Sequence, residues 1–124
     1  MIDSIRFVTL YVADQRRSAE FYVDKLGFEI RTDAEMGPGK RWLELALPGR
    51  TTRLVISKAE DFGAVVDTKL GMMFALGCDD VTGTHAELTR RGANPSDPVV
   101  EPWGSYIQVT DPDGYSVFIS QSDG

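Results

Sequence analysis

The stretch Phe7-Val8-Thr9-Leu10-Tyr11-Val12-Ala13-Asp14 has a weaker counterpart in the second half of the chain, Met73-Phe74-Ala75-Leu76-Gly77-Cys78-Asp79-Asp80. Each run predicts a short strand that ends at an acidic residue. Asp14, and either Asp79 or Asp80, are suited to cap a helix, because a carboxylate accepts hydrogen bonds from the free amide groups of the first turn. An internal repeat of this kind indicates two similar structural modules.

A helix and further strands are predicted after each acidic residue. Apolar residues at helical spacing end at Gly27 in the first half and at Gly92 in the second, and glycine is a good left-handed C-cap. Alternating apolar residues and turn signals such as Asp111-Pro112-Asp113-Gly114 then predict strands. The predicted strands are 29–36, 41–47 and 52–57 in the first half, and 97–101, 105–111 and 115–120 in the second. A loop is expected at 36–40 and a link between the modules at 63–69.

The order of these elements is βαβββ, twice. A four-stranded sheet covered by a helix on one face leaves its other face bare, and two such faces can enclose a ligand site. The sequence therefore predicts an α+β fold in which two βαβββ modules form a curled mixed sheet around a central cavity. We expect one domain over residues 1–124, with modules at about 1–60 and 70–124.

Composition and charge exclude several classes of function. The 124 residues carry a formal net charge of −6, whereas nucleic-acid binding needs a basic face, so no nucleic-acid partner is expected. No apolar run approaches the roughly 20 residues of a membrane helix, and no signal peptide is recognised at the N-terminus, so no membrane partner is expected. Cys78 is the only cysteine, which rules out an intrachain disulfide and favours a cytoplasmic protein.

Four motifs resemble the vicinal-oxygen-chelate superfamily, which comprises glyoxalases, bleomycin resistance proteins and dioxygenases. The motifs are Val12-Ala13-Asp14, Ser18-Ala19-Glu20-Phe21-Tyr22, Lys25-Leu26-Gly27-Phe28 and Asp111-Pro112-Asp113-Gly114-Tyr115. The resemblance covers nearly the whole chain. It implies paired βαβββ modules and commonly a homodimer, but the fold does not choose among the activities of the family.

Enzymes of this family hold a divalent metal with inward-facing His and Glu side chains, two from each module. The resemblance places those positions at Phe7, Val55, Met73 and Phe118, and the assignment at Val55 can slip by one residue. None of these side chains suits a hard or borderline cation, so no metal and no cofactor are expected. The single histidine, His85, is expected on the surface or half-buried on the second helix, and Cys78 in the core.

Strand alternation sorts the remaining side chains between the helix-packed face and the cavity. The predicted cavity is aromatic with a few polar groups, and aromatic rings there would stack on a planar ligand. For Phe7 and Phe118, filling a collapsed core is an equally good explanation, whereas polar neighbours of Trp42 and Trp103 indicate contact with water. The predicted ligand-binding residues are Phe7, Thr9, Tyr11, Trp42, Glu44, Arg53, Val55, Met73, Trp103, Tyr106, Gln108 and Phe118.

Two hypotheses of function follow. The first is a metal-independent protein that binds an aromatic or cationic small molecule in the cavity. The second is an enzyme, either a lyase, isomerase or dioxygenase with an unrecognised metal site, or a metal-free catalyst with Glu44 and Tyr106 as candidate acid–base residues. The alternative role for Glu44 is an ion pair with Arg53 or Arg41. The sequence favours binding, because the metal ligands of the enzymes are missing. It leaves open whether the modules pair within a chain or by exchange of the first strand between subunits.

Overall fold

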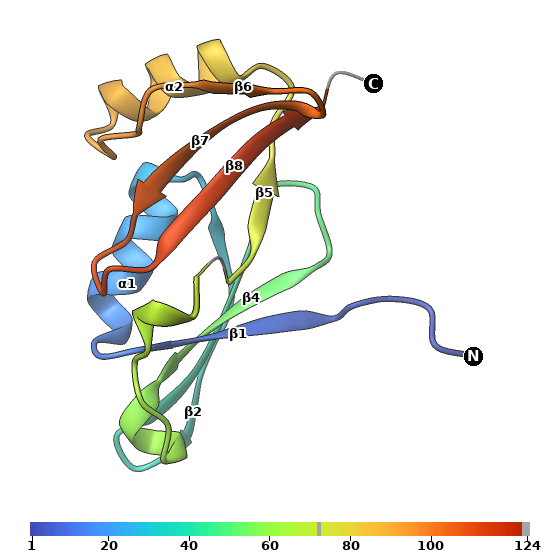
Figure 1. Cartoon of the computed structure of the whole chain (residues 1–124). Helices are drawn as coiled ribbons and strands as arrows, with labels where there is room; N and C mark the ends of the chain where they lie inside the picture. The colour runs from blue at the N-terminus through green and yellow to red at the C-terminus, as the bar shows by residue number, and fades with distance from the viewer. Residues whose placement is uncertain (72, 123–124) are drawn as a thin grey trace. The chain divides into compact units, whose positions relative to one another are not determined.

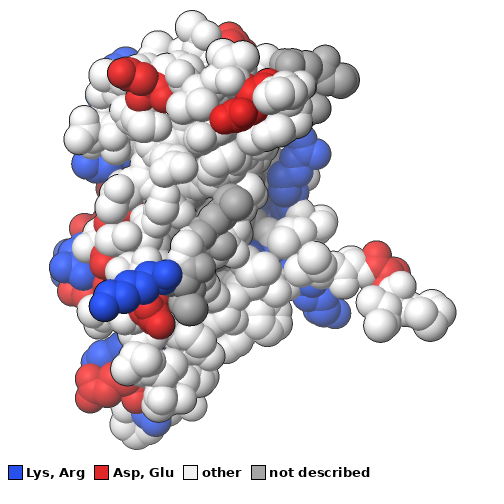
Figure 2. All heavy atoms as spheres, viewed as in Figure 1, with Lys and Arg blue, Asp and Glu red and all other residues white. Residues whose placement is uncertain are grey.

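A computed structural model describes residues 1–71 and 73–122 (Figure 1). The chain divides into two compact units, Met1–Val66 and Asp67–Gly124, and the boundary falls within the predicted link at 63–69. None of the helices among the described residues is long and apolar enough to cross a membrane. On the face seen in Figure 2, acidic and basic side chains are interspersed.

The first unit is a βαβββ module. Its four strands form one mixed sheet in the order β1-β4-β3-β2, in which β1 and β4 are parallel and the other pairs are antiparallel. The helix α1 continues as a turn of π-helix, η1, and a short 3-10 helix, η2, follows the last strand. The elements are β1 (Phe7–Val12), α1 (Gln15–Glu20), η1 (Phe21–Lys25), β2 (Glu29–Gly37), β3 (Lys40–Ala46), β4 (Arg53–Lys58) and η2 (Ala59–Phe62).

The second unit repeats this arrangement. Its sheet has the order β5-β8-β7-β6, again with one parallel pair, β5 and β8. The elements are the 3-10 helix η3 (Thr68–Leu70), β5 (Ala75–Gly77), α2 (Val81–Arg90), β6 (Val99–Glu101), β7 (Gly104–Thr110) and β8 (Ser116–Ser122). The predicted α+β fold with two βαβββ modules is therefore confirmed, and each sheet is mixed and open.

Both helices begin where an aspartate caps them. The Asp14 carboxylate accepts a hydrogen bond from the Arg17 amide, and the Asp80 carboxylate accepts one from the Thr82 amide. Of the two candidates in the second half, Asp80 is thus the cap. Gly27 and Gly92 have φ values of 86° and 78°, so both take the left-handed conformation expected where the helices end.

Each core lies between a sheet and its helix. In the first unit the buried strand residues include Leu10, Leu45 and Ile56, and in the second they include Ile107 and Ile119. Burying such side chains is the main source of stability for each unit. The alternate residues of the strands point to the opposite face of each sheet, away from the helices.

A glutamine fixes the start of each helix to its own sheet. Gln15 donates two hydrogen bonds through Nε2, to the carbonyl oxygens of Arg41 (3.0 Å) and Ile56 (2.9 Å). In the second unit Gln121 accepts a hydrogen bond from the amide of Val81 at 2.6 Å. These bonds hold each helix in register with the strands below it.

Three details differ from the sequence-based expectations. The predicted loop at 36–40 is a tight hairpin, because β2 runs to Gly37, β3 starts at Lys40, and Gly39 supplies the positive φ of 72° that such a turn requires. The strand predicted from Met73 begins only at Ala75, so Met73 precedes the sheet. Cys78 follows β5 and is half-buried rather than part of the core.

Candidate functional site

The strand registers show which positions of the two modules correspond. Val55 on β4 is paired with Thr9 on one side and Glu44 on the other. Phe118 on β8 is paired in the same way with Ala75 and Gln108. Residues paired in this way point to the same face of a sheet, so each module presents one row of equivalent side chains on the face away from its helix.

In the first module this face carries a charged pair held by a tryptophan. The Glu44 carboxylate accepts a hydrogen bond from Trp42 Nε1 (2.8 Å) through Oε2 and forms an ion pair with Arg53 (3.3 Å) through Oε1. Both charged side chains are largely shielded from water, at 21% and 32% exposure. Of the two predicted ion-pair partners for Glu44, Arg53 is therefore the one found, while Arg41 pairs with Asp33.

The equivalent positions in the second module are neutral. Gln108 corresponds to Glu44 and Ser116 to Arg53, and the Ser116 hydroxyl donates a hydrogen bond to Gln108 Oε1 at 3.1 Å. The two modules thus keep the same diagonal contact between their third and fourth strands. The contact is ionic in one module and uncharged in the other, so the two faces differ in polarity.

Aromatic rings accompany the charged pair of the first module. Phe7 and Trp42 make an edge-to-face contact with ring centroids 5.7 Å apart, and Phe7 is 45% exposed. Tyr11 contacts Phe62 of η2 at 6.2 Å. Phe62 did not figure among the predicted site residues, because it lies outside the strands whose alternation revealed the others.

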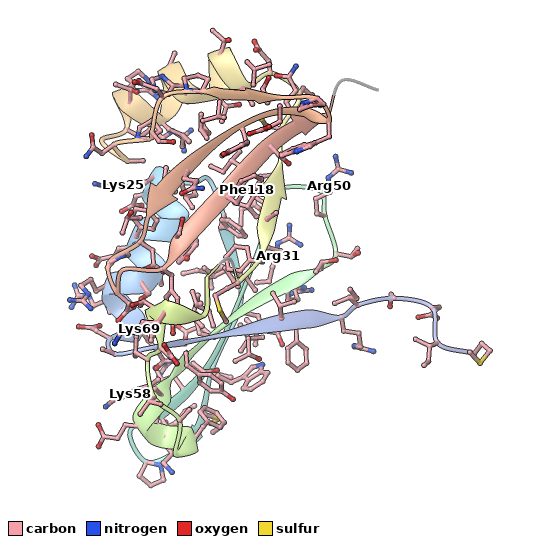
Figure 3. The ribbon with its side chains drawn as sticks, viewed as in Figure 1. Lys25, Arg31, Arg50, Lys58, Lys69 and Phe118 are labelled. Carbon is pink, nitrogen blue, oxygen red and sulfur yellow. The ribbon has the colours of Figure 1, made fainter. Side chains whose placement is uncertain are left out.

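The second module carries three rings in mutual contact. Tyr106 stacks on Phe118 with centroids 4.4 Å apart, and Trp103 stacks on Tyr106 at 5.7 Å with an angle of 8° between the rings. Trp103 lies in the turn between β6 and β7 and is 54% exposed, whereas Tyr106 and Phe118 are half-buried. Figure 3 shows Phe118 on β8. In this three-ring cluster the indole of Trp103 is the outer ring and is accessible to solvent.

The other predicted site residues take varied positions. Thr9 and Arg53 are half-buried, Val55 is fully buried, Gln108 is exposed, and Met73 is 40% exposed just before β5. His85 is half-buried on α2, as expected for a residue of that helix. The structure also reveals a groove on the helix-covered face of the first module, which the sequence did not indicate.

Known proteins with this sequence pattern and architecture identify the family. The model of the glyoxalase/bleomycin resistance protein/dioxygenase superfamily matches residues 4–119. The chain belongs to this superfamily. Among its relatives is YetH, an uncharacterized protein of Bacillus subtilis that is 36% identical over 120 residues, which are 96% of this chain and 98% of YetH.

Solved structures of the superfamily share the fold over the whole chain. TnmS3, an antibiotic binding protein from a Streptomyces species, is 30% identical with a TM-score of 0.84, over 98% of each chain. A superfamily member from Sphaerobacter thermophilus is 27% identical with a TM-score of 0.84, again over 98% of each chain. The resemblance inferred from the four sequence motifs is thus confirmed.

The sequence resemblance places the metal positions of superfamily enzymes at Phe7, Val55, Met73 and Phe118. The registers support the choice of Val55, because it occupies the same place in its module as Phe118 does in the other. Phenyl, isopropyl and thioether groups supply none of the nitrogen or oxygen ligands that a divalent metal of these enzymes needs. Within 1–71 and 73–122, no three His, Cys, Asp or Glu side chains gather closely enough to hold a metal ion. These residues do not fit such a metal.

Proposed function

We propose that the chain is a metal-independent binding protein for a planar aromatic small molecule, which it takes up on the sheet face of the second module that points away from the helix. The observation that carries this proposal is the three-ring cluster of Trp103, Tyr106 and Phe118, one ring of which is open to solvent. The similarity to TnmS3, described as an antibiotic binding protein, supports the same conclusion.

Stacking chemistry suits such a ligand. Each aromatic pair adds about 0.5–1.5 kcal/mol beyond the burial of its surface, and an exposed indole also attracts a cation over its face. The Trp103 ring already lies parallel to Tyr106, so little conformational freedom is lost when a further ring joins the stack. A ligand with a planar aromatic ring, neutral or cationic, is therefore the class that we propose.

The charged pair of the first module favours binding over catalysis. The Glu44 carboxylate already accepts hydrogen bonds from Trp42 and Arg53, so both of its oxygens are engaged. A general base takes up a proton, and protonation of Glu44 would remove the charge that pairs with Arg53. We therefore assign Glu44 a role in positioning Trp42 and assign no catalytic role to Tyr106.

Tryptophan fluorescence tests the proposal directly. The protein should be titrated with metal-free bleomycin and with proflavine, a planar aromatic cation, in the presence of a chelator. We expect saturable quenching that persists in Trp42→Phe and is strongly reduced in Trp103→Ala, a substitution at an exposed turn that leaves the core intact. Equal affinity of the Trp103→Ala variant and the unchanged protein would refute the proposed site.

The Glu44→Gln variant distinguishes the enzyme hypothesis from the binding hypothesis. If the chain were an enzyme with Glu44 as its base, Glu44→Gln would abolish turnover and leave ligand affinity largely unchanged. We expect no turnover in either protein. Because Glu44 and Trp42 belong to the first module and the three-ring cluster to the second, the affinity for proflavine should also be unchanged in Glu44→Gln.

A further inference from the structure

A groove lies on the helix-covered face of the first module, opposite the face that carries Trp42 and Glu44. It has a volume of about 460 Å³ and runs between the α1–η1 helix and the β2–β3 hairpin. Ligand pockets for small molecules fall in the range of about 300–1,000 Å³. The groove lies entirely within the first unit and is separate from the aromatic site proposed above.

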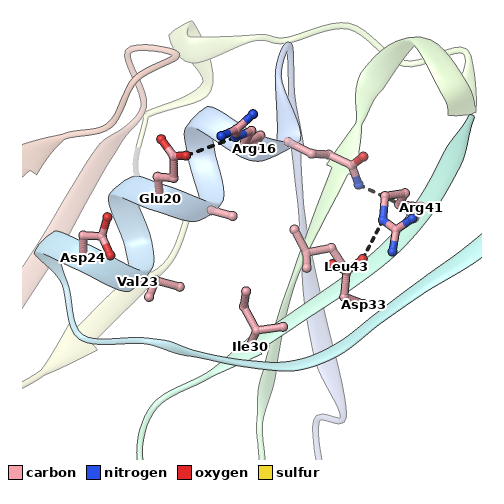
Figure 4. A pocket seen from close by; sticks show the side chains of 10 residues that line it. Arg16, Glu20, Val23, Asp24, Ile30, Asp33, Arg41 and Leu43 are labelled. Atoms are coloured by element: carbon pink, nitrogen blue, oxygen red, sulfur yellow. Dashed lines mark hydrogen bonds and ion pairs between the residues drawn. The ribbon is translucent and has the colours of Figure 1, made fainter.

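The floor of the groove is apolar. Val23 on η1, Ile30 on β2 and Leu43 on β3 direct their side chains toward one another between the helix and the strands (Figure 4). Ile30 is 53% exposed although it lies on the helix-covered face of the sheet. A large aliphatic side chain that stays open to water beside a helix leaves apolar surface for a ligand to cover.

Both walls of the groove contain a backbone irregularity. The helix changes from α to π geometry at Phe21–Lys25, the segment that supplies Val23 and Asp24. In β2 the register shifts between Ile30 and Thr32, so Ile30 pairs with Leu45 and Asp33 with Leu43. Ile30 and Asp33 therefore share a face, although residues three apart in a regular strand point to opposite faces. Irregularities of both kinds are common beside ligand sites.

The rim of the groove is lined by charged side chains, and one of its three carboxylates has no basic partner among the described residues. Arg16 pairs with Glu20 at 3.2 Å, and Arg41 pairs with Asp33 at 2.7 Å. Asp24, at the other end of the groove from Arg41, makes no hydrogen bond or ion pair through its carboxylate with any residue that the structure describes (Figure 4). The rim thus carries one net negative charge next to an apolar floor.

We propose that this groove is a second ligand site, which binds a small apolar molecule with one ammonium group. The apolar part covers Val23, Ile30 and Leu43, and the ammonium group lies next to Asp24. An anionic ligand of the same shape is disfavoured, because both arginines of the rim already have carboxylate partners.

Three probes of one shape test the proposal, namely 4-phenylbutylamine, 4-phenylbutanol and 4-phenylbutyrate. Methyl NMR of the intact protein follows each titration at Val23, Ile30 and Leu43. We expect shifts confined to these methyl groups, and an amine that binds roughly 2–5-fold more tightly than the alcohol, as for a surface ion pair of about 0.5–1 kcal/mol. The carboxylate should bind most weakly.

Two variants separate the contributions of charge and apolar floor. Asp24→Asn should remove the preference for the amine over the alcohol, and the uncharged substitution Ile30→Gln, at an exposed position of the floor, should weaken all three probes. Trp103→Ala should leave every titration unchanged, which distinguishes this site from the aromatic one. The proposal would be overturned if the amine shifted methyl signals of residues outside the groove. It would also be overturned if Asp24→Asn still bound the amine more tightly than the alcohol.

Discussion

Asp111 shows how one side chain fixes a turn. It is buried, and its Oδ1 accepts hydrogen bonds from the backbone amides of Asp113, Gly114 and Tyr115 at 2.9–3.1 Å. These bonds close the Asp-Pro-Asp-Gly turn between β7 and β8 and so set the register that brings Gln108 opposite Phe118. The turn therefore helps to position Gln108 and Phe118 on the face proposed to bind the ligand.

Loss of this carboxylate should destabilise the protein. Hydrogen bonds to a charged group contribute about 1.5–3 kcal/mol, and buried amides without a partner add a further penalty. We expect Asp111→Ala to lower the free energy of unfolding by about 2–3 kcal/mol, measured by urea denaturation. Asp111→Asn keeps an accepting oxygen and should cost less; if the two substitutions cost the same, the three bonds do not act as described.

Glu87 provides a test of the charges on α2. The guanidinium groups of Arg90 and Arg91 donate hydrogen bonds to its carboxylate and lower its pKa from 4.5 to about 2. A carboxyl group whose pKa is depressed on folding stabilises the native state above its ordinary pKa, and this contribution is lost as the pH falls toward 2. NMR titration of the Glu87 carboxyl carbon should show the low pKa, and Arg90→Ala should raise it.

At the level of elements, Gln15 is the residue that fastens α1 to its sheet. Gln15→Ala removes both hydrogen bonds to the carbonyl oxygens of Arg41 and Ile56, each of which contributes about 1 kcal/mol. We expect a loss of about 1–2 kcal/mol in chemical denaturation. The matched control is Arg16→Ala, at the neighbouring and far more exposed position, which should cost little.

The helices could be predicted because single residues mark where they end, whereas other features of the fold lack such local marks in the sequence. Asp14 with Gly27, and Asp80 with Gly92, mark the helix ends, and these signals predicted both helices correctly. The π-turn and the register shift in β2 have no such local signal in the sequence. For that reason the groove between them was not foreseen.

The candidate site was predictable where strands are regular. Alternation along β3 and β7 correctly grouped Trp42 with Glu44 and Tyr106 with Gln108 on one face of each sheet, opposite Leu43 and Ile107. Alternation does not tell which charged neighbour a side chain takes, and only the structure shows that Glu44 pairs with Arg53. It also gave no indication of Phe62, which reaches Tyr11 from a 3-10 helix.

For the whole molecule, uptake of a divalent metal is the property that decides between the binding and the enzyme hypotheses. Because phenyl, isopropyl and thioether groups stand at the positions that the resemblance assigns to the metal ligands, we expect no stoichiometric uptake of nickel, zinc, iron(II) or manganese. Elemental mass spectrometry of the untagged protein before and after soaking measures this. One tightly bound metal per chain would show that Phe7, Val55, Met73 and Phe118 do not mark the enzymes' ligand positions, and the enzyme hypothesis would then take precedence.

The register shift in β2 also bears on how relatives should be aligned. Arg31 is the additional residue between the pairs Ile30–Leu45 and Thr32–Glu44, and its guanidinium donates to the carbonyl oxygens of Leu47 and Arg50. A homologue one residue shorter at this point would lose these contacts of Arg31 but would keep all the remaining side chains of β2 on their present faces. A single-residue gap between Thr32 and Glu35 would instead move the side chains beyond it to the opposite face, as far as the second register shift between Glu35 and Gly37.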